Sequence, residues 1–236
     1  MNLQQIRENE RNSHEELYSS EELYQEGSWL NKPIKTVLDI LTLFEGYKEL
    51  RALDIGSGVG RNSIAIAKQY KYISCRVDCV DILNLAIEKL KVNAEKYGVP
   101  HCIHGIVSAI EDFEISESTY DLVLSVSALE HIDSKESFVK KLCEIEKGIR
   151  KNGVVCLVIN SEITERDRAT GEPLLPQFEV SLPTEELQEL LHKTFAGWEV
   201  LKTMVREQKY DIPRENIISA LETKVVTFVG RKRENM

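Results

Sequence analysis

Short apolar runs alternate with amphipathic stretches through the middle of the chain. Apolar runs of strand length cover residues 50–55, 74–80, 103–107, 120–126 and 154–159. Helical spacing of apolar residues among charges covers residues 62–69, 83–97 and 134–149. Near-continuous apolar strands separated by amphipathic helices indicate a parallel sheet covered on both faces, and right-handed crossovers make it doubly wound. We therefore predict an α/β fold built on a doubly wound, mostly parallel sheet.

The end of the chain departs from this alternation. A helix is predicted over residues 184–194, and strands over residues 198–208 and 223–229 follow without a comparable helix between them. Two strands joined in this way are most simply an antiparallel pair at the sheet edge. The connection over residues 161–182 is expected to be a loop. No repeat or linker divides the sequence, so we predict one domain over residues 49–236, preceded by an N-terminal helical lid or cap segment, residues 1–48.

The 236 residues carry a formal net charge of −9. An acidic surface repels phosphate backbones and anionic lipids, so we expect no DNA and no membrane partner. No apolar run approaches the ~20 residues of a membrane span, and the polar N-terminus lacks the apolar core of a signal peptide. The five cysteines form no C-x-x-C pair, which predicts a reduced, cytoplasmic protein. The segment His101-Cys102-Ile103-His104 has no second ligand pair, so no metal is expected.

A glycine-rich loop follows the first predicted strand, with the sequence Asp54-Ile55-Gly56-Ser57-Gly58-Val59-Gly60. Glycines let the backbone turn tightly and approach a ligand, while the start of the next helix offers free N–H groups. The G-x-G-x-G spacing differs from the dinucleotide pattern G-x-G-x-x-G, and Asp54 would face a pyrophosphate as a second anion. Both observations disfavour a nicotinamide oxidoreductase. A cationic ligand that carries an amino-acid group fits better.

Two acids compete for the position that binds a ribose. Asp81 ends the second predicted strand and lies 21 residues beyond Gly60. That offset matches the roughly 20 residues expected of a carboxylate on ribose hydroxyls. Asp78 falls within the strand rather than at its carboxyl end, so we favour Asp81.

Residues 50–160 resemble the class I S-adenosylmethionine-dependent methyltransferases in the glycine loop, in Asp81 and in the segment Leu129-Glu130-His131. The resemblance implies a Rossmann-like methyltransferase fold with S-adenosylmethionine as cofactor. It places the methionyl group at the glycine loop, the ribose at the acid closing the second strand and the adenine after the third strand. The cofactor-binding residues that it implies are Asp54, Gly56, Ser57, Gly58, Asp81, Ile82, Ala109, Ile110 and Ser125. A closer resemblance, carried by Gly60-Arg61-Asn62-Ser63, is to the tellurite-resistance methyltransferases and their small-molecule relatives.

The predicted function is methyl transfer to a small-molecule acceptor by in-line displacement. Residues 125–128 lack the Asn/Asp-Pro-Pro-aromatic sequence that accompanies amino methylation of nucleic-acid bases or glutamine. Two alternatives stay open: a non-catalytic cofactor-binding or regulatory protein, and methylation of a protein or RNA. His131, just past the fourth strand, is the candidate base, and ordering of its loop is an equal alternative.

The N-terminal segment is both acidic and amphipathic. Its first 32 residues contain seven glutamates against three basic residues, and apolar and aromatic side chains interrupt them. Tyr18, Tyr24 and Trp29 are candidates for a lid, because an aromatic face attracts a sulfonium or a cationic acceptor. A helix packed on the flank of the domain is the alternative. The loop over residues 161–182 is expected to form the opposite wall.

Overall fold

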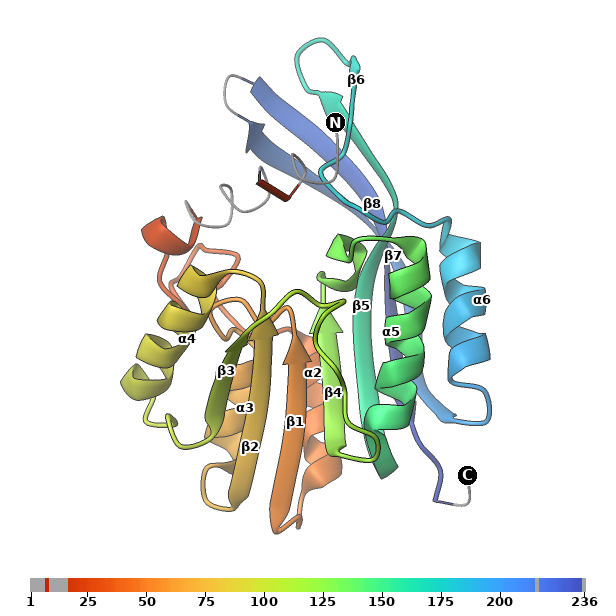
Figure 1. The fold of residues 1–236 in the computed structure, drawn as a ribbon. Coiled ribbons are helices and arrows are strands. Elements are labelled where there is room, and N and C mark those ends of the chain that lie inside the picture. The colour runs from red at the N-terminus through yellow and green to blue at the C-terminus, as the bar shows by residue number, and fades with distance from the viewer. Residues whose placement is uncertain (1–6, 9–16, 215–216, 235–236) are drawn as a thin grey trace.

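The computed structural model of the chain describes residues 7–8, 17–214 and 217–234. Its strands form one sheet with the order β3-β2-β1-β4-β5-β8-β7, and the short β6 pairs with β5 (Figure 1). The parallel strands are β1 (Glu49–Ile55), β2 (Ser74–Asp81), β3 (Ile103–Val107), β4 (Tyr120–Val126) and β5 (Ile149–Asp167). The carboxyl ends of β1 to β4 meet at one edge of the sheet, called the carboxyl edge below.

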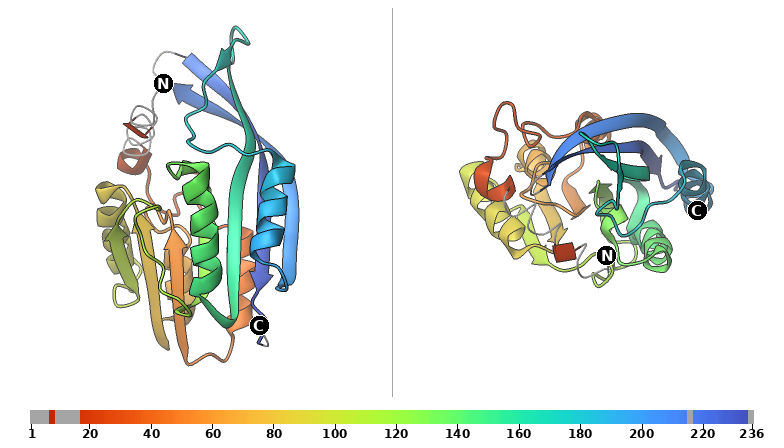
Figure 2. Two further views of the ribbon diagram at one scale, coloured as in Figure 1. Left: turned by 45° about the vertical axis from the view of Figure 1, so that its right-hand side comes forward. Right: turned by 90° about the horizontal axis from the view of Figure 1, so that it is seen from above.

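Helices cover both faces of the sheet (Figure 2). The first face carries α2 (Lys35–Leu41), which continues into η1 (Thr42–Phe44), with α3 (Ser63–Tyr70) and α4 (Asn84–Lys96). The second carries η2 (Leu129–His131), α5 (Lys135–Gly148) and α6 (Thr184–Thr194). Neighbouring residues of β1 divide between the two cores, because Ala52 belongs to the core that contains Ile64 of α3, and Leu53 belongs to the core that contains Phe138 of α5. The predicted doubly wound sheet is confirmed.

The last two strands form the predicted antiparallel edge. They are β7 (Glu199–Arg214) and β8 (Ile217–Arg231), and β8 lies between β5 and β7. Both strands are longer than the sequence pattern predicts, and with β5 they extend past the carboxyl edge as a twisted arm (Figure 2). Pro213 is tolerated in β7 because an edge strand leaves one row of backbone groups unpaired.

The expectation of a loop throughout residues 161–182 is wrong for its first part. β5 continues to Asp167, and β6 (Pro173–Leu174) pairs with it. Polar residues of this part of β5 are paired across the sheet. Glu165 is 3% exposed, accepts a 2.9 Å hydrogen bond from Nε of Arg214 and accepts another from the hydroxyl of Ser219. A strand with polar positions satisfied in this way gives no apolar alternation in the sequence.

The described part of the N-terminal segment packs against the first face. Tyr18, Leu23 and Leu30 are buried in the same core as α3 and α4. The Tyr97 hydroxyl at the end of α4 donates a 3.0 Å hydrogen bond to the carbonyl of Leu23. Residues 1–6 and 9–16 lie outside the described residues, and the division at residue 48 stays a prediction. No helix among the described residues is long and apolar enough to cross a membrane.

Candidate active site

A cavity opens at the carboxyl edge, next to the neighbouring strands β1 and β4. The chain leaves β1 toward the first face of the sheet and leaves β4 toward the second face. Open α/β sheets usually bind ligands at such a switch point. The cavity has about 1080 Å³ of empty space, part of it open to solvent. Its wall comes from the ends of β1 to β4, from the N-terminal segment and from the loop before α6. The predicted residues in the wall are Tyr18, Trp29, Gly56, Ser57, Gly58, Asp81, Ile82, Ala109, Ile110 and His131.

The glycine loop forms the floor of the cavity. The amides of Gly56 and Ser57 donate to the carbonyl of Val80, at 2.8 and 3.0 Å, and so tie the loop to β2. Gly56 has φ +71°, and a Cβ there would lie 2.2 Å from the Cβ of Ala128, which directly precedes η2. Gly58 has φ +53°, and its Cβ would lie 2.8 Å from the hydroxyl of Tyr18. The loop therefore requires glycine for both its backbone conformation and its close contacts.

Asp81 lies at the point where β2 ends and meets the glycine loop. Its Oδ2 accepts a 2.8 Å hydrogen bond from the amide of Gly58, and its Oδ1 accepts a 2.9 Å bond from the amide of Leu83. These two amides fix the carboxylate at the cavity wall. An oxygen of a carboxylate can accept a further hydrogen bond, so Asp81 can still bind a ligand hydroxyl.

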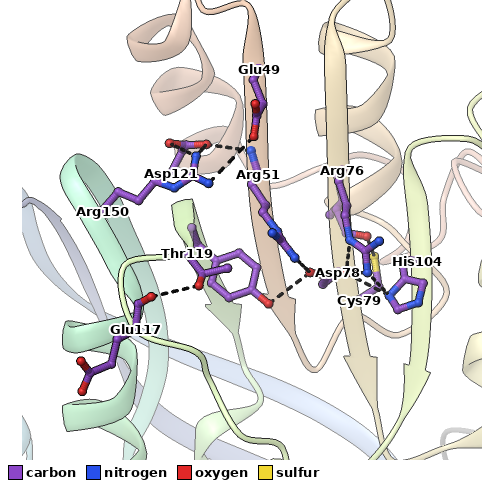
Figure 3. A network of polar contacts seen from close by, with 12 residues as sticks. Glu49, Arg51, Arg76, Asp78, Cys79, His104, Glu117, Thr119, Asp121 and Arg150 are labelled. Atoms are coloured by element: carbon purple, nitrogen blue, oxygen red, sulfur yellow. Dashed lines mark hydrogen bonds and ion pairs between the residues drawn. The ribbon is translucent and has the colours of Figure 1, made fainter.

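Asp78 belongs to a different network, away from the cavity (Figure 3). Its carboxylate accepts a 2.8 Å bond from Nε of Arg76 and a 3.1 Å bond from the hydroxyl of Tyr120. His104 and Arg51 also lie against it, with nitrogen–oxygen distances of 2.9 and 3.9 Å. The side chain of Asp78 is 4% exposed, so these partners offset the cost of burying its charge. Of the two acids, Asp81 is the one in the cavity wall.

Three predicted residues lie outside the cavity wall. Asp54 is 1% exposed behind the glycine loop, where the hydroxyl of Ser63 donates to it. Burial raises the pKa of the Asp54 carboxyl to about 7. Ser125 is fully buried and donates a 3.1 Å hydrogen bond to the carbonyl of Ile55. Tyr24 donates a 2.8 Å bond to the carbonyl of Arg61. These contacts support the loops around the cavity from behind.

Two aromatic residues of the N-terminal segment do reach the cavity. Tyr18 is 5% exposed and lies over Gly58. Trp29 is 48% exposed, and the guanidinium of Arg61 lies 4.8 Å from its ring centroid. Arg61 also donates a 3.1 Å hydrogen bond to the carbonyl of Trp29. The segment therefore contacts Gly58 of the glycine loop and Arg61 just after the loop.

His131 lies at the end of η2 beside a residue that the sequence analysis did not single out. Its Nδ1 is 3.1 Å from Oε2 of Glu179, and its ring stacks on Phe178 with a centroid distance of 4.8 Å. The amide of Val180 donates a 2.9 Å bond to the carbonyl of Glu130, and this bond anchors Glu179 next to His131. A carboxylate on Nδ1 favours the tautomer with its lone pair on Nε2, which is the form of a general base.

Arg7 and Glu111 complete this end of the cavity and were also missed. The guanidinium of Arg7 contacts Glu111, and its Nε lies 3.5 Å from Oε1 of Glu179. Glu111 directly follows the predicted adenine residues Ala109 and Ile110, so its position was available in the sequence. Glu179 lies in an irregular segment whose folding against η2 no periodicity reveals, and Arg7 is helical but far from this segment along the chain. Within the described residues, no group of three or more His, Cys, Asp or Glu side chains is arranged to hold a metal ion.

Comparisons with known proteins find a methyltransferase domain in the chain. Residues 52–153 match the methyltransferase domain family. Norajmaline N-methyltransferase of Rauvolfia serpentina is 30% identical over 101 residues, which are 42% of this chain and 32% of that protein. Ubiquinone biosynthesis O-methyltransferase of Rickettsia conorii is 29% identical over 109 residues, 46% of this chain and 34% of that protein. The matches therefore span about a third of these relatives' length.

Solved structures share the fold over most of the chain. TehB from Haemophilus influenzae has a TM-score of 0.64 and 20% identity over 85% of this chain and 62% of its own. The 1,6-didemethyltoxoflavin-N1-methyltransferase of Burkholderia thailandensis has a TM-score of 0.59 and 15% identity over 99% of this chain and 92% of its own. Residues 52–153 therefore match a methyltransferase domain, and the chain shares the fold of solved S-adenosylmethionine-dependent methyltransferases.

Proposed function

We propose that this protein transfers the methyl group of S-adenosylmethionine to a small-molecule acceptor bound in the carboxyl-edge cavity. The observation that carries the proposal is the position of Asp81. Its carboxylate is fixed by the amides of Gly58 and Leu83 at the wall of the cavity, where a ribose diol can be bound. This arrangement joins the acid that closes β2 to the glycine loop that follows β1.

The residues around Asp81 fit the cofactor. A Cβ on Gly56 or Gly58 would meet neighbouring atoms, so glycine at these two positions lets the loop keep its tight turn beside the cavity. The hydroxyl of Ser57 is buried in the cavity wall without a hydrogen-bond partner among the described residues, and a ligand group would satisfy it. In our proposal Gly56, Ser57 and Gly58 hold the methionyl group, and Asp81 holds the ribose. Ile82, Ala109 and Ile110 border the adenine.

Bound S-adenosylmethionine supplies an electrophilic methyl group on a sulfonium. The protein's own contribution is to align the acceptor, exclude water and move a proton. Tyr18 lies over Gly58, Trp29 lies against Arg61, and both line the cavity, where they would limit access of water to the transferred group. His131, held by Glu179, is positioned to take a proton from the acceptor, and this is the role we propose for it.

Three observations support a small acceptor in a reducing environment. The matched relatives are named as methyltransferases of small molecules. The net charge of −9 opposes a nucleic-acid substrate. All five cysteines are free thiols, which supports the cytoplasmic location that we propose.

The direct test is a product screen with S-adenosylmethionine that carries an isotopically labelled methyl group. The protein is incubated with pools of small metabolites, and mass spectrometry detects any molecule that gains the label. We expect a labelled small molecule with the wild-type protein and none with Asp81→Ala. Binding of S-adenosylhomocysteine without any labelled product would favour a non-catalytic cofactor-binding protein. A label found only on protein or RNA would contradict the small-molecule assignment.

A further inference from the structure

The end of the cavity beside η2 holds a charged cluster that the cofactor assignment does not use. Glu179 contacts His131 through one carboxylate oxygen, at 3.1 Å, and Arg7 through the other, at 3.5 Å. Glu111 contacts the same guanidinium from the turn that follows β3. All four side chains line the cavity. They come from four separate segments of the chain, and the fold brings them together.

The cluster is acidic and poorly solvated. The side chain of Glu179 is 2% exposed and that of Glu111 is 13% exposed. Two carboxylates against one guanidinium leave one negative charge when the imidazole is neutral. A carboxylate removed from water to this extent is costly unless a cation or several hydrogen-bond donors face it. This end of the cavity therefore favours a ligand with positive charge.

Arg7 shows what kind of group the site accommodates. It is a planar nitrogen cation, and it reaches both carboxylates with its side chain 28% exposed. The protein supplies this cation from its N-terminal segment, not from the sheet or from the helices that build the cavity. A ligand cation entering from the cavity can make the same two contacts if Arg7 withdraws.

We propose that Glu179, together with Glu111, selects an acceptor that carries a basic nitrogen, and that this nitrogen takes the place of Arg7. The inference rests on the proposed methyl transfer and names its acceptor class. Glu179 binds the ammonium form and, through Nδ1, keeps His131 in the tautomer that accepts a proton at Nε2. An anionic acceptor bound by Arg7 is disfavoured because the same guanidinium already faces two carboxylates.

The reaction that follows balances in protons and electron pairs. The ammonium nitrogen gives one proton to His131, and its lone pair forms the bond to the transferred methyl carbon. The bond from that carbon to the donor sulfur breaks, and its electron pair stays on sulfur. The products are a methylated amine and S-adenosylhomocysteine, and the proton on His131 passes to solvent.

The test measures binding rather than turnover, so it does not depend on knowing the natural acceptor. The protein is saturated with S-adenosylhomocysteine and titrated with matched amines, alcohols and carboxylates on benzyl, phenethyl and indolylethyl frames. The variants are Glu179→Gln and Arg7→Ala, and Glu189→Gln on the exposed face of α6 is the control. Affinity for S-adenosylhomocysteine is measured for each variant first, as a check that the protein folds.

We expect at least one amine to bind about tenfold or more tightly than its matched alcohol, the scale of a charged hydrogen bond. In Glu179→Gln this preference should fall to within about threefold, while Glu189→Gln keeps it. Arg7→Ala should strengthen amine binding, because the competing cation is gone. The proposal is overturned if no amine binds, if carboxylates or alcohols are preferred, if Glu179→Gln keeps the amine preference, or if Arg7→Ala weakens amine binding. Failure of the wild type to bind S-adenosylhomocysteine would instead overturn the proposed function.

Discussion

Asp54 provides a test of the electrostatics behind the glycine loop. Its carboxyl is 1% exposed, and burial raises its pKa from an ordinary value of 3.8 to about 7. Between these two values the folded protein holds a proton on Asp54 that the unfolded chain has lost. The free energy of unfolding must therefore fall as the pH rises from about 4 to about 7, and this contribution is constant above that window.

The size of the effect follows from the shift. Each pH unit in which the folded state binds one extra proton changes the free energy of unfolding by about 1.4 kcal/mol. Between pH 5 and pH 8, Asp54 of the folded protein stays protonated for about two pH units before it ionises near pH 7. The free energy of unfolding should therefore fall by about 2–3 kcal/mol over this range. Asp54→Asn removes the titration and keeps an oxygen that can accept the hydrogen bond from Ser63. Between pH 5 and pH 8 the free energy of unfolding of Asp54→Asn should therefore rise by about 2–3 kcal/mol relative to that of wild type.

The assay is urea unfolding of wild type and Asp54→Asn at pH 5, 6, 7 and 8. Asp39→Asn is the matched control, because Asp39 lies on the exposed side of α2 and pairs with Lys35 at 2.8 Å. Titrations elsewhere in the protein cancel in the differences between variants. The stability of the control should run parallel to that of wild type. Parallel curves for wild type and Asp54→Asn would refute the reasoning, since Asp54 would then be ionised throughout.

Two further substitutions test the loop and the neighbouring acid. Gly56→Ala combines a positive φ with a Cβ placed 2.2 Å from Ala128, so we expect urea unfolding to show a loss of about 2–4 kcal/mol. Gly98 is the control, because it has a similar φ of +69° and a Cβ there would meet no atom within 4 Å. Gly98→Ala should therefore lower the free energy of unfolding by only about 1–2 kcal/mol. Equal losses in the two variants would contradict the contact between position 56 and Ala128. Asp78→Ala should lower the free energy of unfolding by about 2–3 kcal/mol, less than the loss of a fully buried ion pair, because the side chains of its partners Arg76 and His104 are half-exposed. The affinity of Asp78→Ala for S-adenosylhomocysteine, measured by calorimetry, should stay within about twofold of the wild-type value. A larger loss of affinity would indicate that Asp78, not Asp81, binds the ribose.

The sequence predicts the parallel core well because buried strands and amphipathic helices leave strong periodic signals. It also distinguishes Asp81 from Asp78, since the position of an acid along a strand sets its distance from the carboxyl edge. Position does not show which way a side chain points. Asp54 and Ser125 both lie near strand ends, but their side chains turn into the interior and bond Ser63 and Ile55.

The parts that the sequence missed depend on contacts between distant segments. β5 continues through Glu165 because Arg214 and Ser219 satisfy a buried carboxylate that looks like a loop residue in the sequence. Glu179 reaches His131 only because the loop before α6 is hydrogen-bonded to η2. No local pattern reports such pairings, which arise when the chain is folded.

The central claim is that the carboxyl-edge cavity binds S-adenosylmethionine through Asp81. Calorimetric titration of wild type and Asp81→Ala with S-adenosylhomocysteine tests it most directly, with thermal unfolding of each protein as the check on folding. The substitution should weaken binding by at least about 1.5 kcal/mol, roughly tenfold or more, because the ligand loses hydrogen bonds to a charged group. A folded Asp81→Ala variant with wild-type affinity would contradict the assignment of the site.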